Sequence, residues 1–210
     1  MRLDEITGPP EGDSGQSSPE EQERERQRAV WAPLIASSRA EREKLSPREQ
    51  LLWILSDWDG LPAYGPAAIH DGRKAALEDA LLALETQMRP YRDVNTTLYR
   101  GIVLTPEQCD DLIDTGSCTV PQSRIGSWTK SYDVAKDFAA EMPGRGIVIG
   151  AEADRLDVLV DFEAVARSRK RSEKGRFDIE MAVREEEVLV RNSDPQLVVS
   201  RGMVVWKNFR

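Results

Sequence analysis

The chain has 210 residues, of which 40% are hydrophobic and 31% charged, a composition that suits one globular domain, or one domain with a small appendage. Its 29 Lys and Arg against 37 Asp and Glu give a net charge of −8, which argues against a protein that coats nucleic acid through a basic surface. One histidine and two cysteines indicate no His-rich metal site and no disulfide framework. The sequence shows no membrane-length apolar run and no Sec-type signal, so we expect a cytoplasmic protein, or one delivered by a non-Sec route, without a membrane partner.

The first 90 residues are predicted to be mainly helical. Residues 1–18 contain little that can be buried, which indicates a disordered tail. A first helix is expected to begin near Ser18, followed by Pro and two acids. A capping box over residues 46–49 predicts a second helix, and a third is expected over residues 71–88. The apolar face of the second helix consists of Leu51, Ile54, Leu55 and Trp58.

After residue 95 the sequence changes to short β-prone runs separated by turn residues. Strands are expected over residues 97–103, 146–151, 156–161, 186–190, 196–200 and 202–206. One helix, over residues 131–142, is expected among them. Since long crossover helices are missing, the sheet should be mainly antiparallel and the fold class α+β.

Two segments of this β-rich half carry polar groups of chemical interest. Arg100 lies inside an apolar strand, where a guanidinium needs either a structural salt bridge or a phosphate or carboxylate ligand. Ser127 and Thr129 lie two residues apart, so on a strand their hydroxyls share a face. Helix capping or strand pairing would explain each hydroxyl by itself.

A third segment places acids directly before an apolar strand. If the segment is extended, Glu185 and Glu187 project to one side and Glu186 to the other. Two carboxylates so placed can divide cation stabilisation and proton abstraction between them. The plainer interpretation of such a charge run is a solvated face.

These three pieces, in this order, resemble the arginine–serine–glutamate class of mono-ADP-ribosyltransferases, of bacterial toxin or phage type. The matching segments are 99–101, 127–129 and 185–187, followed at family spacing by Ala135 and Phe138. The resemblance implies a split β-sandwich with N-terminal flanking helices and a cleft for NAD, which is a substrate, and it implies no metal. We therefore expect a tail over 1–18, a helical region over 19–60 and the catalytic domain over 61–210.

The resemblance also implies roles for the residues that would hold NAD. Arg100 matches the family arginine that contacts NAD, and Gly101 the position whose backbone lies near the nicotinamide. Ser127 matches the serine that orients the catalytic glutamate, and Thr129 retains a second hydroxyl in the NAD site. Phe138 matches an aromatic beside the nicotinamide, although burial in the helix core would explain it equally well.

Glu187 matches the catalytic glutamate, which binds the 2′-hydroxyl of the nicotinamide ribose and stabilises the developing sugar cation. Glu185 matches the residue that selects the acceptor, and a glutamate there goes with arginine acceptors. Glu186 should face away. Trp128 departs from the family pattern, so it is either a substrate contact or a core residue.

Residues 167–176 precede the glutamates, and six of the ten are basic whereas one is acidic. The bland interpretation is a solvated, mobile loop. The alternative is a recognition element, with Arg169, Lys170 and Arg171 attracting an acidic protein surface or a nucleic acid.

The expected reaction is transfer of ADP-ribose from NAD to an arginine of a protein, with release of nicotinamide. Alternatives that keep the fold are an RNA or DNA acceptor and simple NAD hydrolysis by a toxin. The non-enzymatic alternative is a degenerate domain that binds a partner. A neutralising or delivery partner could bind the N-terminal region.

Overall fold

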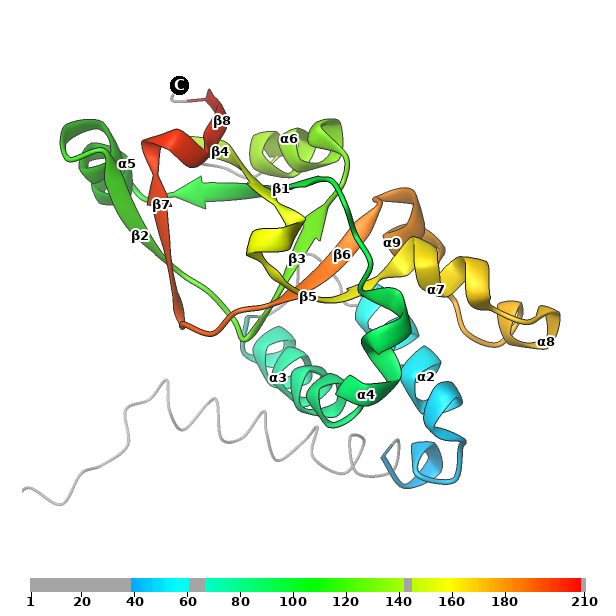
Figure 1. Ribbon diagram of the computed structural model, residues 1–210. Coiled ribbons are helices and arrows are strands. Elements are labelled where there is room, and N and C mark those ends of the chain that lie inside the picture. Colours follow the sequence, from blue (N-terminus) through cyan, green and yellow to red (C-terminus); the bar gives the residue numbers. More distant parts are fainter. Residues whose placement is uncertain (1–38, 61–66, 142–144, 209–210) are drawn as a thin grey trace, which may run out of the picture.

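The structure, a computed structural model, describes residues 39–60, 67–141 and 145–208 (Figure 1). The tail expected over residues 1–18 and the helix expected to begin near Ser18 lie outside the described residues.

Helices make up the first part of the described chain, and strands with shorter helices between them follow. The α-helices are α2 (Pro47–Asp59), α3 (Ala67–Ala83), α4 (Glu85–Met88), α5 (Pro106–Asp114), α6 (Tyr132–Glu141), α7 (Phe162–Ser168), α8 (Arg171–Lys174) and α9 (Glu180–Arg184). The strands are β1 (Thr97–Leu104), β2 (Ser117–Pro121), β3 (Ile125–Thr129), β4 (Arg145–Glu152), β5 (Asp157–Asp161), β6 (Glu187–Arg191), β7 (Gln196–Ser200) and β8 (Val204–Asn208). Single 3₁₀ turns span Arg89–Tyr91, Ala153–Arg155 and Arg201–Met203.

The expected capping box begins α2. The Ser46 side chain accepts from the backbone N of Glu49 at 3.3 Å, and the Glu49 carboxylate accepts from the backbone N of Ser46 at 3.1 Å. Gly60 caps the helix at its other end. The third helix differs from its prediction because Leu84 leaves helical geometry, which divides the segment into α3 and α4.

All strand pairs are antiparallel, as expected, and the main sheet has the order β5-β6-β3-β1-β4-β8. The sheet has two halves, since β1 and β3 share only the pair Tyr99–Thr129 whereas β1 pairs with β4 along its whole length. Strands β2 and β7 form a separate ribbon. The described fold is therefore mixed α and β, with a sheet that divides between β1 and β3.

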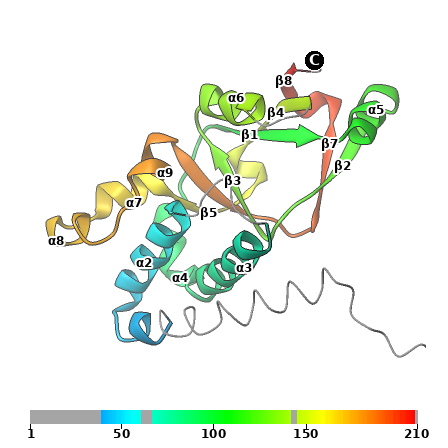
Figure 2. The same ribbon diagram turned by 180° about the vertical axis from the view of Figure 1, so that it is seen from behind.

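Helices α2, α3 and α6 lie on one side of the main sheet, whereas α5 lies beside β2 on the other (Figures 1 and 2). α2 packs its apolar side, including Leu55 and Trp58, against a cluster that contains Ile125 of β3 and Leu189 of β6. α6 covers β1 and β4, and it lies so close that a Cβ at Gly101 would collide with the Ala135 carbonyl. The opposite face of the sheet carries a second cluster, to which the β2–β7 ribbon contributes.

The first of these clusters joins residues on both sides of the boundary expected at residue 60, since α2 shares it with the sheet. Glu78 of α3 adds a polar anchor, because its buried carboxylate accepts from the backbone N of Ile125 at 3.2 Å and pairs with Arg124 at 3.3 Å. These contacts place α2 and α3 against the start of β3. None of the helices in the described part of the chain has the length and apolar content needed to span a bilayer.

Candidate active site

The Glu187 side chain lies at the start of β6, beneath the C-terminal turn of α2. It is 9% exposed, and its Oε1 accepts a hydrogen bond from the indole Nε1 of Trp58 at 3.2 Å. The Ser127 hydroxyl, on the neighbouring strand β3, also hydrogen-bonds the carboxylate. The structure thus places Ser127 beside Glu187, the glutamate that it was expected to orient.

Burial raises the pKa of the Glu187 carboxyl to about 7, although the hydrogen bonds from Ser127 and Trp58 act in the opposite direction. The negative charges of Glu185 and Asp59 raise the pKa further. A carboxyl poised near neutral pH in a buried position is characteristic of catalytic acids, bases and charge stabilisers.

The Glu-x-Glu segment is not extended, which corrects the expectation from the sequence. Glu185 ends α9 with near-helical geometry, and Glu186 has a φ of 52°, in the left-handed region that is uncommon for residues other than glycine. The turn is fixed from β3, since Thr129 Oγ1 donates to the carbonyl of Glu185 at 2.5 Å and the backbone N of Lys130 donates to that of Glu186 at 3.2 Å. Thr129 therefore uses its hydroxyl to hold the backbone beside Glu187.

Glu185 nevertheless lies near Glu187 and Asp59. Burial raises the pKa of Glu185, and the negative charge of Asp59 raises it further. Burial likewise raises the pKa of Asp59, whose carboxylate accepts hydrogen bonds from the backbone N of Ala182, at 2.6 Å, and of Met181. Three carboxyl groups from α2, α9 and β6 thus gather around one turn.

Arg100 lies where β1 and β3 diverge. Its side chain shares a face of β1 with the core residue Leu98, whereas Ser127 and Glu187 face α2. The guanidinium nevertheless reaches β3, since a Cβ added at Gly126 would lie 2.9 Å from Nη1 of Arg100. Gly126 thus leaves room for Arg100 next to Ser127.

Arg100 is a half-buried cation, and the described residues form no ion pair with it. Among the described residues, no group accepts a hydrogen bond from its Nη1 atom. Burial lowers the pKa of the guanidinium below its ordinary value. The amide Nδ2 of Asn192 lies 3.1 Å from where a Cβ at Gly126 would be, and it donates one hydrogen bond to the carbonyl of Ser123 at 2.6 Å. These groups fit an anionic ligand such as a phosphate.

Gly101 and Phe138 lie together at the contact between β1 and α6, where a Cβ at Gly101 would lie 3.2 Å from that of Phe138. Phe138 is 41% exposed, so it is not the buried helix residue that one interpretation of the sequence allowed. The exposed ring of Phe138 therefore lies beside Gly101, the residue that follows Arg100, where a ligand can contact it.

Trp128 is a core residue, which removes it from the expected substrate contacts. Its side chain is 3% exposed and packs in the cluster that contains Val188 and Val190. The alternation of β3 points it away from Ser127 and toward the face on which the β2–β7 ribbon lies, where it does not reach solvent.

The basic segment over residues 167–176 is folded. Arg169 donates to the carbonyl of Phe177 at 2.5 Å, Lys170 precedes α8 as its N-cap, and Arg171 is the exposed first residue of α8. The buried Glu173 pairs with Arg48 of α2 at 3.0 Å. The segment is therefore held against α2, which the interpretation as a mobile loop did not anticipate.

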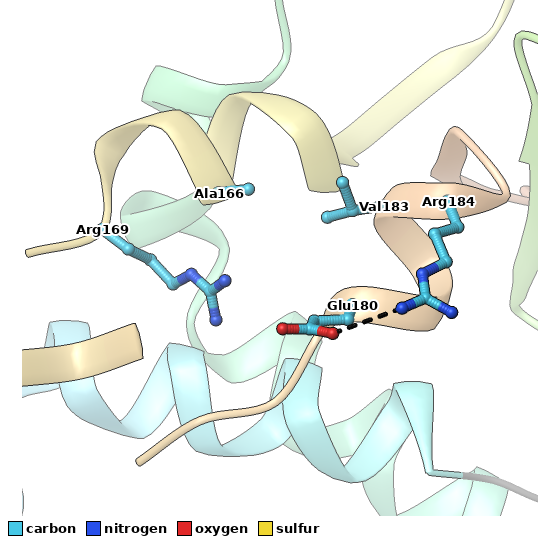
Figure 3. A pocket seen from close by; sticks show the side chains of 5 residues that line it. All are labelled: Ala166, Arg169, Glu180, Val183 and Arg184. Atoms are coloured by element: carbon cyan, nitrogen blue, oxygen red, sulfur yellow. Dashed lines mark ion pairs between the residues drawn. The ribbon is translucent and has the colours of Figure 1, made fainter. Parts of the chain in front are cut away.

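A hollow of about 180 Å³ lies between α7 and α9 (Figure 3). Its lining residues are Ala166, Arg169, Glu180, Val183 and Arg184. Glu180 and Arg184 pair across one side at 3.6 Å. The hollow places Arg169 beside the helix that leads to Glu185, and Glu187 does not line it.

Reasoning from the sequence missed Trp58, Asp59 and Asn192. Trp58 fits the apolar spacing of α2 and was therefore assigned to the core, and its hydrogen bond joins positions 129 residues apart. Asp59 is the last residue of α2. No local pattern in the sequence relates these residues to Glu187 or Arg100.

No protein-family model matches the chain, and neither a curated protein nor a solved structure shows significant similarity to it. Within the described ranges, no group of three or more His, Cys, Asp or Glu side chains is arranged to hold a metal ion.

Proposed function

We propose that the chain is an NAD-dependent mono-ADP-ribosyltransferase that transfers ADP-ribose to an arginine of a target protein and releases nicotinamide. The observation that carries the proposal is Glu187, a buried carboxyl held by Ser127 and placed beside Glu185. The proposed fold is the split β-sandwich of such enzymes. The division of the sheet between β1 and β3 supports it.

The proposed reaction breaks the bond between C1′ of the ribose and the nicotinamide nitrogen, which keeps the bonding electron pair. Positive charge then develops on the sugar, and the ionised carboxylate of Glu187 stabilises it in a site of low polarity. A guanidinium nitrogen of the acceptor forms the new bond to C1′. Glu185, which is half-buried, is placed to bind that guanidinium and to accept its proton.

NAD carries two phosphates, and Arg100 supplies the cation for them. The fit rests on the unpartnered Nη1 of Arg100 and on Gly126, which leaves space for the guanidinium. Arg100 and Glu187 lie on opposite faces of the sheet, so an NAD molecule that contacts both would cross the sheet where it divides between β1 and β3. Phe138 offers a ring to the nicotinamide.

The test uses NAD labelled in its adenylate part, incubated with the protein and a cell extract. We expect label on protein that hydroxylamine removes, as is typical of an arginine linkage, and no label with Glu187→Gln. Label that resists protease and is lost with RNase or DNase would move the acceptor to nucleic acid. Nicotinamide release without labelled macromolecules would replace transfer by hydrolysis. No release and no label from a folded wild type would overturn the proposal.

A further inference from the structure

The C-terminal turn of α2 contacts the candidate catalytic carboxylate directly. The indole Nε1 of Trp58 lies 3.2 Å from Glu187 Oε1, and the two side chains are 5% and 9% exposed. When Glu187 is ionised, this hydrogen bond is charge-assisted, and such a bond is stronger than one between two neutral groups.

The indole is held in place by contacts on either side of Trp58. Ser56 Oγ accepts from the backbone N of Asp178 at 3.1 Å, and Asp59 accepts from that of Ala182 at 2.6 Å. Lys74 of α3 lies over the indole ring, 5.8 Å from its centre. The turn of α2 is therefore fixed to the segment that leads into Glu185 and Glu187.

We propose that Trp58 is a positioning residue for Glu187, and that its indole N–H and the Ser127 hydroxyl together fix the carboxylate in the orientation that the sugar cation requires. This inference rests on the proposed function. An ionised carboxylate offers about four acceptor positions, so these two donors leave room for a ribose hydroxyl. Trp58 acts through Glu187 and makes no substrate contact itself.

The charges around Glu187 make the Trp58 indole N–H important for the ionisation of this carboxyl. Asp59 and Glu185 place negative charge near Glu187, and both favour its protonated form. The donors Trp58 and Ser127 favour the ionised form, and the ammonium of Lys74 lies over the indole. Removal of the indole N–H should therefore reduce the fraction of Glu187 that is ionised at neutral pH.

The first experiment compares Trp58→Phe with Trp53→Phe. Trp53 is a matched control, because it lies on the same helix and its Nε1 donates to Asp57 Oδ2, also at 3.2 Å. In Trp58→Phe, the acid limb of the pH profile of kcat for NAD cleavage should move up by about one pH unit. The kcat of the variant should then be about tenfold below that of the wild type at pH 6 and close to it at pH 9. KM should change little, and Trp53→Phe should retain the wild-type profile. Equal changes in both variants, or a uniform loss at every pH, would overturn the inference.

The second experiment does not depend on catalysis, and Trp58 is unchanged in both proteins that are compared. The indole N–H resonance of Trp58 is followed by NMR from pH 5 to pH 9 in the wild type and in Glu187→Gln. We expect one titration near pH 7 in the wild type that disappears in the variant. A resonance that does not titrate, or that titrates in both proteins, would overturn the inference. If the resonance titrates as expected while the folded protein cleaves no NAD, the contact between Trp58 and Glu187 is retained, whereas the proposed function and the positioning role of Trp58 in it both fail.

Discussion

The pKa of Glu187 has a consequence for stability that can be measured without any substrate. An isolated Glu has a pKa of 4.5, and burial raises that of Glu187 to about 7, so the folded chain binds this proton more tightly than the unfolded chain does. The stability that depends on Glu187 is therefore complete below about pH 4.5 and is lost as the pH rises through about 7. Because each pH unit corresponds to about 1.4 kcal/mol, the ionised carboxylate weakens folding by about 3 kcal/mol above pH 7.

Glu187→Gln removes this charge and retains the shape of the side chain. Its amide oxygen can accept from Trp58, and its NH₂ group can donate to Ser127. We expect the variant to be more stable than the wild type by about 3 kcal/mol at pH 8.5 and by less than about 1 kcal/mol at pH 4.5. For a chain of this length, the gain at pH 8.5 corresponds to a rise in Tm of about 6–12 °C.

The assay is urea unfolding of both proteins at a series of pH values. All other ionisable groups are common to the two chains, so the difference between their free energies of unfolding isolates position 187. A difference that does not depend on pH, or a variant less stable than the wild type at pH 8.5, would refute the reasoning.

Three further variants test the parts that position the site. Arg48→Ala removes two hydrogen bonds from the buried carboxylate of Glu173, at 3.0 and 3.2 Å, so unfolding in urea should require about 2–4 kcal/mol less; an unchanged midpoint would contradict this. Gly101→Ala places a methyl group against the backbone of α6, and we expect about 1–3 kcal/mol of destabilisation by calorimetry; a wild-type Tm would show that the helix has room to move. Gly126→Ala places a methyl group against Arg100, so the Kd for NAD in titration calorimetry should rise about tenfold while unfolding remains cooperative; an unchanged Kd would argue against a role for Arg100 in NAD binding.

The sequence predicts a helix or strand well where the residues that form the element also carry its local signal. The capping box over 46–49 marks the start of α2, and the β-prone runs lie on observed strands. Helix α5, which was not expected, also begins with a capping box, formed by Thr105 and Gln108. The same local signal that predicts α2 therefore also marks α5 in the sequence.

The features that could not be predicted from the sequence depend on contacts between residues far apart in the chain. The basic segment forms α8 because Arg48, 125 positions earlier, neutralises Glu173. Glu186 adopts a positive φ because β3 holds the turn through Thr129 and Lys130, so a prediction of extended backbone was wrong. Apolar periodicity alone cannot indicate that an indole on a core face donates to a carboxylate.

The most direct test of the central claim is nicotinamide release from NAD at pH 8, with an acceptor-containing extract, by wild type and Glu187→Gln. At this pH the variant is expected to be at least as stable as the wild type, so a slow variant cannot be attributed to unfolding. We predict release by the wild type and a rate at least ~100-fold lower in the variant. Equal rates in the two proteins, or no release by a folded wild type, would contradict the assignment of Glu187 to an NAD-cleaving site.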